Sequence, residues 1–260
     1  MSTAAATEQL VSPYKSLSQE QIDEFHLRGY IAYGKLLDDP LIEVLRAEYD
    51  RLFAEARQTG RFRNLSIGDT EDLDKKNNAD EQMLQIMQMC ERSLDFRQLL
   101  YDGRILDIAE DLIGPNIQLF HDQALFKPAH HGGSVFWHQD NAYWQCVPAN
   151  LVSCWLTLDD VDVANGAMHL IPGSHLAAHG HERGDVLLDA SDAVGGVEPV
   201  VVDLPAGGAM FHHCQTLHST PPNRTDRQRR AFAAHFMTPG TRSAAGDMPV
   251  SFARPLLRSR

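Results

Sequence analysis

The sequence is poor in cysteine and in basic residues. Its four cysteines are scattered without Cys-x-x-Cys spacing, which argues against a disulfide framework or a zinc knuckle and favours free thiols in a reducing compartment. Lysine and arginine number 23 against 35 aspartate and glutamate residues, for a net charge of −12. Because a phosphate-backbone partner needs a clustered basic surface, we do not expect nucleic acid as a partner.

Long apolar runs and internal repeats are also missing. No run could span a bilayer, and residues 1–9 lack the apolar core of a signal peptide. We therefore expect a cytoplasmic protein without a membrane partner. The absence of repeats excludes solenoids. A chain of 260 residues with 43% hydrophobic content can bury a full core, so a single domain over residues 1–260 is predicted; the oligomeric state is not encoded in any recognisable pattern.

The hydrophobic pattern changes near residue 115. Apolar residues repeat at helical spacing over residues 42–56, so residues 1–115 are predicted to be mainly helical support, and the methionine-rich cluster at 83–89 is interpreted as packing in that layer. Residues 116–240 contain short β-rich runs separated by turn residues, which is typical of a barrel or sandwich. Residues 241–260 are predicted to be a C-terminal tail. The expected fold class is mainly β with buttressing α-helices.

Histidine is the most informative residue type, with 13 copies, most of them after residue 120. In Trp137-His138-Gln139-Asp140 the imidazole and the carboxylate are two positions apart, so on a strand they project to the same face and can share one metal ion. His218, which begins a turn-rich stretch, is the preferred third ligand, although spacing alone leaves His212 and His213 open.

Two histidines and one carboxylate on one side of an ion leave three coordination positions open, the facial arrangement of non-haem Fe(II) oxygenases. Zinc is the alternative metal. A closed structural zinc site would prefer four cysteine-rich ligands, and a zinc hydrolase would need a general base beside the bound water. Neither pattern is visible in this sequence.

A cosubstrate that chelates iron as a 2-oxo acid needs a cation for its distal carboxylate, and arginine supplies a planar two-donor fork. Arg227, Arg229 and Arg230 compete for this role. On the predicted strand Arg229 shares its face with the small Ala231 and Ala233, which leave room for a bound acid. The face of Arg230 carries phenylalanines and is expected to pack against the helical layer. This alternation favours Arg229.

Several motifs taken together resemble the phytanoyl-CoA dioxygenase family of Fe(II)- and 2-oxoglutarate-dependent oxygenases. The resemblance covers roughly residues 19–238. It rests on Trp137-His138-Gln139-Asp140, on Trp155 with Asp159-Asp160, on the segment from Asn165-Gly166 to Pro172-Gly173-Ser174-His175, and on the segment from His218 to Arg229.

The resemblance implies a double-stranded β-helix core, a jelly roll of the cupin type. It implies that His138, Asp140 and His218 bind Fe(II), and that Arg229, eleven residues after His218, anchors the distal carboxylate of 2-oxoglutarate. Related halogenases carry a small apolar residue at the carboxylate position, so Asp140 indicates a hydroxylating or desaturating enzyme.

Further positions match the family without such a clear role. Thr220 and Trp155 correspond to positions that commonly lie beside the cosubstrate. His175 belongs to the Pro-Gly-Ser-His turn and is interpreted as structural rather than as a ligand, and Lys127-Pro128 matches a recurring pair.

The implied reaction consumes 2-oxoglutarate and O2, releases succinate and CO2, and hydroxylates a small organic substrate whose identity is not readable. The alternative is a non-enzymatic, cupin-like metal- or ligand-binding protein, which would have no need of Arg229 as an anchor. Residues 61–81 and 176–197 are long and polar, and we predict that they form mobile loops bordering the site mouth.

Overall fold

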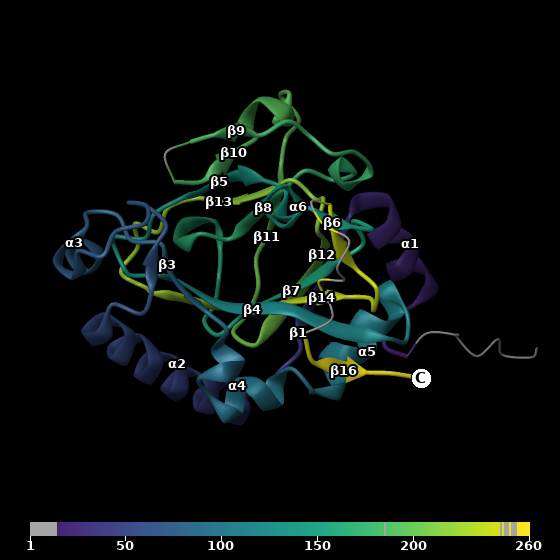
Figure 1. The fold of residues 1–260 in the computed structure, drawn as a ribbon, viewed down its shortest axis with the longest axis horizontal. Coiled ribbons are helices and arrows are strands. Elements are labelled where there is room, and N and C mark those ends of the chain that lie inside the picture. Colours follow the sequence, from purple (N-terminus) through teal and green to yellow (C-terminus); the bar gives the residue numbers. More distant parts are fainter. Residues whose placement is uncertain (1–14, 185, 245, 247–249, 251–253) are drawn as a thin grey trace, which may run out of the picture.

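Two antiparallel β-sheets form the centre of the protein (Figure 1). The computed structural model describes residues 15–184, 186–244, 246, 250 and 254–260. The larger sheet has eight strands in the order β1-β12-β7-β14-β4-β3-β2, with β16 paired to β4. In that order the strands are β1 (Tyr30–Lys35), β12 (Gly208–His213), β7 (Val152–Thr157), β14 (Arg229–Met237), β4 (Ile117–Lys127), β3 (Leu84–Met87), β2 (Arg63–Asn64) and β16 (Leu256–Arg258).

The smaller sheet lies above the larger one in Figure 1 and faces it. Its four strands follow the order β11 (Val200–Val202), β8 (Met168–Leu170), β13 (His218–Thr220) and β5 (Val135–His138). Two short two-stranded sheets complete the β structure of the described residues: β9 (Glu182–Arg183) with β10 (Leu188–Asp189), and β6 (Cys146–Val147) with β15 (Arg242–Ser243).

Helices cover the face of the larger sheet that points away from the smaller sheet (Figure 1). Those on this face are α2 (Asp39–Thr59), α4 (Leu94–Leu99) and α5 (Gly103–Ile113). The other helical segments are α1 (Gln19–Arg28), α3 (Leu73–Asn78), α6 (Asp140–Trp144) and the 3-10 turns η1 (Met89–Glu91), η2 (Val163–Asn165), η3 (Ser174–Leu176) and η4 (Ser191–Val194). The predicted fold class, mainly β with buttressing helices, is confirmed.

Local sequence signals set the ends of the first helices. Ser18 and Gln21 form a reciprocal capping box at the start of α1, which satisfies two backbone N–H groups that the helix itself leaves without acceptors. Gly29, with φ +83°, ends that helix in the left-handed region that glycine tolerates best. Helix α2 begins after Asp38, whose side chain accepts from the Leu41 N–H group.

Strand β14 is buried along its whole length because both of its faces are covered. On the helix side Phe232 packs against Phe96 of α4, with ring centroids 5.1 Å apart. Arg230 faces the same layer and donates to Asp159 at 2.6 and 3.0 Å and to Asp50 of α2 at 2.9 Å. These contacts join the sheet to the helices, as the alternation along this strand predicts.

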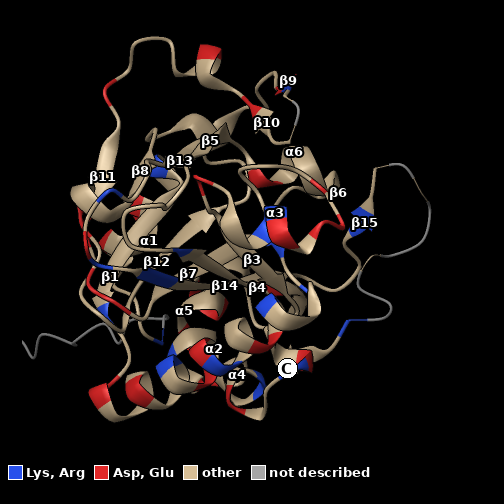
Figure 2. Ribbon diagram, turned by 90° about the vertical axis from the view of Figure 1, so that its left-hand side faces the viewer, with Lys and Arg blue, Asp and Glu red and all other residues tan. Residues whose placement is uncertain are grey.

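The outer helical surface carries charges of both signs. Figure 2 shows acidic and basic positions interspersed along α2 and α4, and Arg51 of α2 pairs with Glu48 and Glu55 in its own helix. This mixed surface differs from the clustered basic surface that nucleic acid requires. Within the described ranges, no helix combines the length and the apolar character needed to cross a bilayer.

The N-terminal part is less purely helical than the sequence predicts. Strand β1 pairs with β12, and β2 and β3 extend the larger sheet beyond β4. The methionine-rich cluster at 83–89 contains strand β3 and turn η1 rather than a helix. The C-terminal segment contributes β16, which pairs with β4.

Candidate metal centre and its cavity

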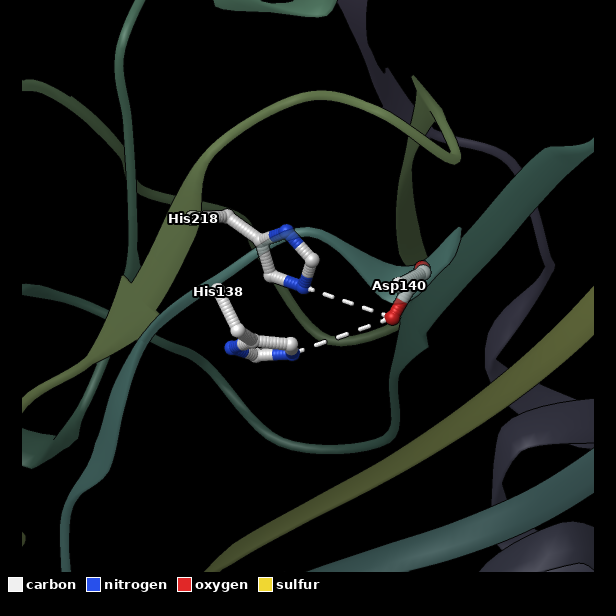
Figure 3. A group of neighbouring side chains, drawn as sticks. All are labelled: His138, Asp140 and His218. Carbon is white, nitrogen blue, oxygen red and sulfur yellow. Dashed lines mark ion pairs between the residues drawn. The ribbon is translucent and has the colours of Figure 1, made fainter. Parts of the chain in front are cut away.

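The structure brings together His138, Asp140 and His218 (Figure 3). His138 ends β5 and lies opposite His218 of β13 in the sheet register. Asp140 begins α6, so a turn after the strand, and not strand alternation as expected, brings it to the histidines. Asp140 Oδ1 lies 3.7 Å from His138 Nε2 and 3.8 Å from His218 Nε2. In the part of the chain that the structure describes, no other group of three histidine, cysteine or acidic residues meets in this way.

Hydrogen bonds orient both imidazoles. His138 Nδ1 lies 2.8 Å from the Phe136 carbonyl oxygen, and His218 Nδ1 lies 2.9 Å from that of Thr216. Because a carbonyl only accepts, each Nδ1 carries the proton and each Nε2 presents a lone pair toward Asp140. Burial lowers the pKa of both histidines. They are therefore neutral at pH 7, which is the form that binds a metal.

The carboxylate of Asp140 is held through its second oxygen. The Ser153 hydroxyl donates to Oδ2 at 3.1 Å, and His212 Nε2 lies 3.1 Å from the same atom. Burial alone would raise the pKa of Asp140, but the neighbouring His218 and His212 hold it well below its usual range. The ionised carboxylate thus keeps Oδ1 for a cation, and His212, an alternative ligand in the sequence, supports Asp140 instead. His213 contacts His175 edge to face, with ring centroids 5.5 Å apart, and is not a member of the group of three.

A cavity of about 360 Å³ lies beside these residues, between the two sheets. Its apolar wall includes Leu65, Met83, Met87, Leu125, Val135, Trp155, Met168, Val186 and Leu187. Its polar and aromatic wall includes Arg63, Gln85, His121, Gln123, Tyr143, Trp144, Thr220, Arg229 and His235.

Arg229 is a buried cation that forms no ion pair with a carboxylate of the described residues. Its side chain is 1% exposed; Nη1 donates to the Leu125 carbonyl oxygen at 3.2 Å, and its guanidinium carbon lies 5.7 Å from the centre of the Trp155 ring. Within the described residues Nε has no hydrogen-bond partner. Burial lowers the pKa of Arg229 to about 10, so the group is still charged at pH 7. A buried, unpaired guanidinium is a suitable receptor for an anion.

The other two positions expected beside a cosubstrate lie in the same cavity. Trp155 is 1% exposed and forms its wall, and Thr220 Oγ1 is buried without a partner among the described residues. These orphaned polar atoms, together with the three atoms that could hold a metal ion, fit a divalent cation and an acid bound side by side.

Other residues singled out in the sequence have structural contacts. The Lys127 ammonium donates to the Thr220 carbonyl oxygen at 3.1 Å and to that of Pro221, at the end of β13. His175 Nε2 lies 3.1 Å from the His26 carbonyl oxygen, so its turn contacts the end of α1. The Pro-Gly-Ser-His turn thus fixes the first helix to the sheets.

Sequence reasoning missed several residues of the cavity. Met83 and Met87 were interpreted as packing, yet both line it. Other cavity residues could have been found from the sequence of β4, where every second residue, His121, Gln123 and Leu125, faces the cavity. Two successive polar residues at inward positions of a central strand, here His121 and Gln123, indicate a lined cavity rather than an apolar core.

Comparisons with known proteins assign the chain to a family. The family model for phytanoyl-CoA dioxygenase matches residues 25–231. A probable alpha-ketoglutarate-dependent hypophosphite dioxygenase of Stutzerimonas stutzeri is 29% identical over 64% of this chain and 61% of its own length, so the chain matches less than two thirds of that relative. The mouse peroxisomal phytanoyl-CoA dioxygenase is 25% identical over 85% of this chain and 68% of its own. The ectoine dioxygenase of Bordetella parapertussis is 23% identical over 80% and 71%.

Solved structures with the same fold include an epimerase, SnoN, in complex with Fe3+, alpha ketoglutarate and nogalamycin RO, with a TM-score of 0.74 and 24% identity over 92% of this chain and 98% of that one. The carbocyclase SnoK from nogalamycin biosynthesis has a TM-score of 0.73 and 24% identity over 88% and 87%. The cupin-like fold expected from the sequence is confirmed. Because the family model spans most of the chain, this protein belongs to the phytanoyl-CoA dioxygenase family, and its enzyme class is the one that the sequence predicts, a 2-oxoglutarate-dependent non-haem iron dioxygenase.

Proposed function

We propose that this protein hydroxylates a small organic molecule, with His138, Asp140 and His218 as the ligands of Fe(II). One observation carries the proposal: two imidazole nitrogens and one carboxylate oxygen meet at the wall of a cavity that also contains the unpaired guanidinium of Arg229. A facial set of three ligands leaves the remaining positions of the metal for a cosubstrate and dioxygen. A non-enzymatic binding protein would have no use for this second, anionic site.

Bound iron, 2-oxoglutarate and dioxygen together supply the oxidation, in which one oxygen atom enters succinate, the other enters the substrate, and CO2 leaves. The residues of the chain bind and orient the reactants. Arg229 would hold the distal carboxylate of 2-oxoglutarate through charge-assisted hydrogen bonds. Trp155 and Thr220 would complete that pocket, since both line the cavity and the threonine hydroxyl has no other described partner.

The hydrogen bonds around the ligands keep them in one arrangement. Ser153 and His212 hold Asp140 Oδ2, so Oδ1 is the oxygen that faces His138 and His218. Such outer contacts typically change metal affinity or activity by about 10–100-fold when they are removed.

The two long polar segments border the mouth of the cavity. Arg63 and Leu65 come from residues 61–81, and Val186 and Leu187 come from residues 176–197. The Tyr143 hydroxyl of α6 accepts a hydrogen bond from the Leu188 N–H group at 2.8 Å. These contacts would exclude water from the reacting atoms. That the segments move is part of the proposal.

The four cysteines are free and buried, which supports the proposed cytoplasmic compartment. The decisive experiment is an anaerobic titration of the Fe(II)-loaded protein with 2-oxoglutarate, followed by exposure to O2 and measurement of succinate. We expect a new absorption band on titration and succinate on oxygenation. Succinate formation with zinc in place of iron, or no response to 2-oxoglutarate, would contradict the proposal.

A further inference from the structure

A line of hydrogen-bonded side chains runs from the mouth of the cavity to Asp140, and each of these side chains comes from the next strand of the larger sheet. The strands are β2, β3, β4, β14 and β7, which are neighbours in this order. The side chains are Arg63, Gln85, Gln123, His235 and Ser153, and the line ends on Asp140. Beyond Ser153, the next strand β12 contributes His212 to the same carboxylate oxygen.

The two ends of this line fix the direction of every hydrogen bond in it. Arg63 can only donate, and it donates to Gln85 Oε1 at 3.3 Å. The ionised Asp140 can only accept, and it accepts from Ser153 at 3.1 Å. Gln85 therefore donates to Gln123, and Gln123 donates to His235 Nε2 at 2.9 Å.

His235 is thus neutral, with its proton on Nδ1, and passes a hydrogen bond to Ser153 Oγ at 2.7 Å. In this arrangement both glutamine oxygens already accept a hydrogen bond. The groups left over along the line are the second amide hydrogens of Gln85 and Gln123 and further N–H groups of Arg63. This wall of the cavity consequently offers donors, and it favours a ligand rich in acceptor oxygens.

The charges around the cavity also favour a ligand with acceptor oxygens, and specifically an anionic one. Among described residues that line it, the charged side chains other than histidine are Arg63, Arg229 and Asp140. The charges of a divalent iron and of the doubly negative 2-oxoglutarate cancel, and so do those of Asp140 and Arg229. The positive charge of Arg63 is then not balanced by another group in the cavity. Its ion-pair partner is Asp69, at 3.1 Å; the side chains of Arg63 and Asp69 are 48% and 82% exposed, and an ion pair at such an exposed position contributes little.

We infer that the substrate is a small acid whose carboxylate or phosphonate group binds to Arg63, with Gln85 and Gln123 as additional donors. The inference rests on the proposed function, because the charge balance includes iron and 2-oxoglutarate. A cavity of about 360 Å³ is near the lower end of ligand sites and also has to hold the cosubstrate, so the acid is small. Its apolar part would lie against side chains such as Met83 and Met87.

The test uses three probes of similar size: butanoate, propylphosphonate and the neutral butyramide. Each is titrated anaerobically into the protein loaded with Fe(II) and 2-oxoglutarate, and the absorption band of that complex is followed. Isothermal titration calorimetry with the same probes on the metal-free protein provides a readout independent of iron. The acid that binds more tightly identifies the headgroup.

We expect both acids, but not butyramide, to shift the band, and Arg63→Gln to raise their Kd by about tenfold or more, as for loss of a charge-assisted hydrogen bond. Arg61→Gln is the matched control: it removes the same charge from an exposed arginine outside the cavity, and Kd should stay within about twofold. Arg63→Lys keeps the charge without the fork and should give an intermediate Kd.

The inference is overturned if butyramide binds as well as the acids, if none of the three probes binds, or if Arg63→Gln leaves the Kd of the acids unchanged. Failure of the proposed function looks different. In that case the Fe(II)-loaded wild type forms no band with 2-oxoglutarate, while calorimetry still reports whether Arg63 selects acids.

Discussion

Replacing Arg229 with methionine should weaken 2-oxoglutarate binding and, at the same time, stabilise the protein in the absence of ligands. The guanidinium is 1% exposed, and no carboxylate of the described chain lies within ion-pair distance of it. Burial lowers the pKa of Arg229 to about 10. At about 1.4 kcal/mol for each factor of ten in acidity, this corresponds to a destabilisation of about 3 kcal/mol at neutral pH.

The pH dependence of this destabilisation follows from the protonation states of Arg229 in the folded and the unfolded protein. Below pH 10 the folded and the unfolded protein both carry the proton, so the cost of the buried charge is fully present and does not vary with pH. It is relieved only as the pH rises through the lowered pKa of Arg229. Methionine keeps an unbranched side chain without the charge, so we expect the free energy of unfolding to rise by about 1–3 kcal/mol. For a protein of this size the Tm rises by about 2–4 °C per kcal/mol.

The same substitution removes the proposed anchor of the cosubstrate. Loss of a charge-assisted, two-donor contact should cost about 2–4 kcal/mol, and the Kd for 2-oxoglutarate should rise about 30- to 1000-fold. Thermal denaturation with and without 2-oxoglutarate measures both effects: the cosubstrate should stabilise the wild type and leave Arg229→Met unchanged. Fe(II) binding should persist.

Arg230→Met is the control, since Arg230 is paired with Asp159 and Asp50. It should lower stability, because Asp50 loses this ion pair and Asp159 keeps only the more distant Arg46, at 3.5 Å, while 2-oxoglutarate binding is retained. The reasoning is refuted if Arg229→Met is the less stable protein by more than about 1 kcal/mol, or if Arg230→Met, and not Arg229→Met, abolishes 2-oxoglutarate binding.

Four further predictions follow from the site and the core. Asp140→Ala should lower Fe(II) affinity at least tenfold in calorimetric titration, because the loss of a contact outside the ligand shell already costs about that much. Full hydroxylation by this variant, or chlorinated product from the wild type, would show that Asp140 is not a ligand. Ser153→Ala leaves Asp140 Oδ2 with one described partner and should lower Fe(II) affinity by about tenfold; unchanged affinity would show that the hydroxyl does not position the carboxylate. Phe232→Ala should lower the free energy of unfolding by about 3–5 kcal/mol in urea denaturation, and a loss below about 1 kcal/mol would contradict its place in the core. Residues 61–81 and 176–197 should gain protection from hydrogen exchange when 2-oxoglutarate and substrate bind; equal exchange in both states would argue against closure.

The division of the fold into a helical and a β part could be predicted because apolar spacing and turn residues are local signals. The strands of the N-terminal part could not. Tyr30–Lys35 is a six-residue segment that directly follows a helix, and it becomes a strand by pairing with Gly208–His213, far along the chain. Leu84–Met87 consists mainly of residues that also favour helices, and so short an apolar run has no decisive period.

Sequence spacing identified His138 and Asp140 as candidate metal ligands but could not decide which histidine is the third. His138 and Asp140 are close in sequence and meet whether the chain continues as a strand or turns, as it does here into α6. The choice between His218 and His212 depends on which strand end points to Asp140, and only the register decides it. The line of hydrogen-bonded side chains from Arg63 to Ser153 could not be predicted from the sequence, because each of its strands contributes only one side chain to it.

The strand order of the larger sheet also governs how the protein can fold. Strand β1 has no partner until β12 has been made, and β4 lies beside β14, the last long strand. Sheets built from such distant partners have a high contact order and fold slowly, over milliseconds to seconds or longer. During synthesis the apolar faces of β1 and β4 are exposed before their partners leave the ribosome, so the nascent chain is vulnerable to aggregation. The proposed metal site likewise forms late, because His138 of β5 meets its partner His218 only after β13 has been made.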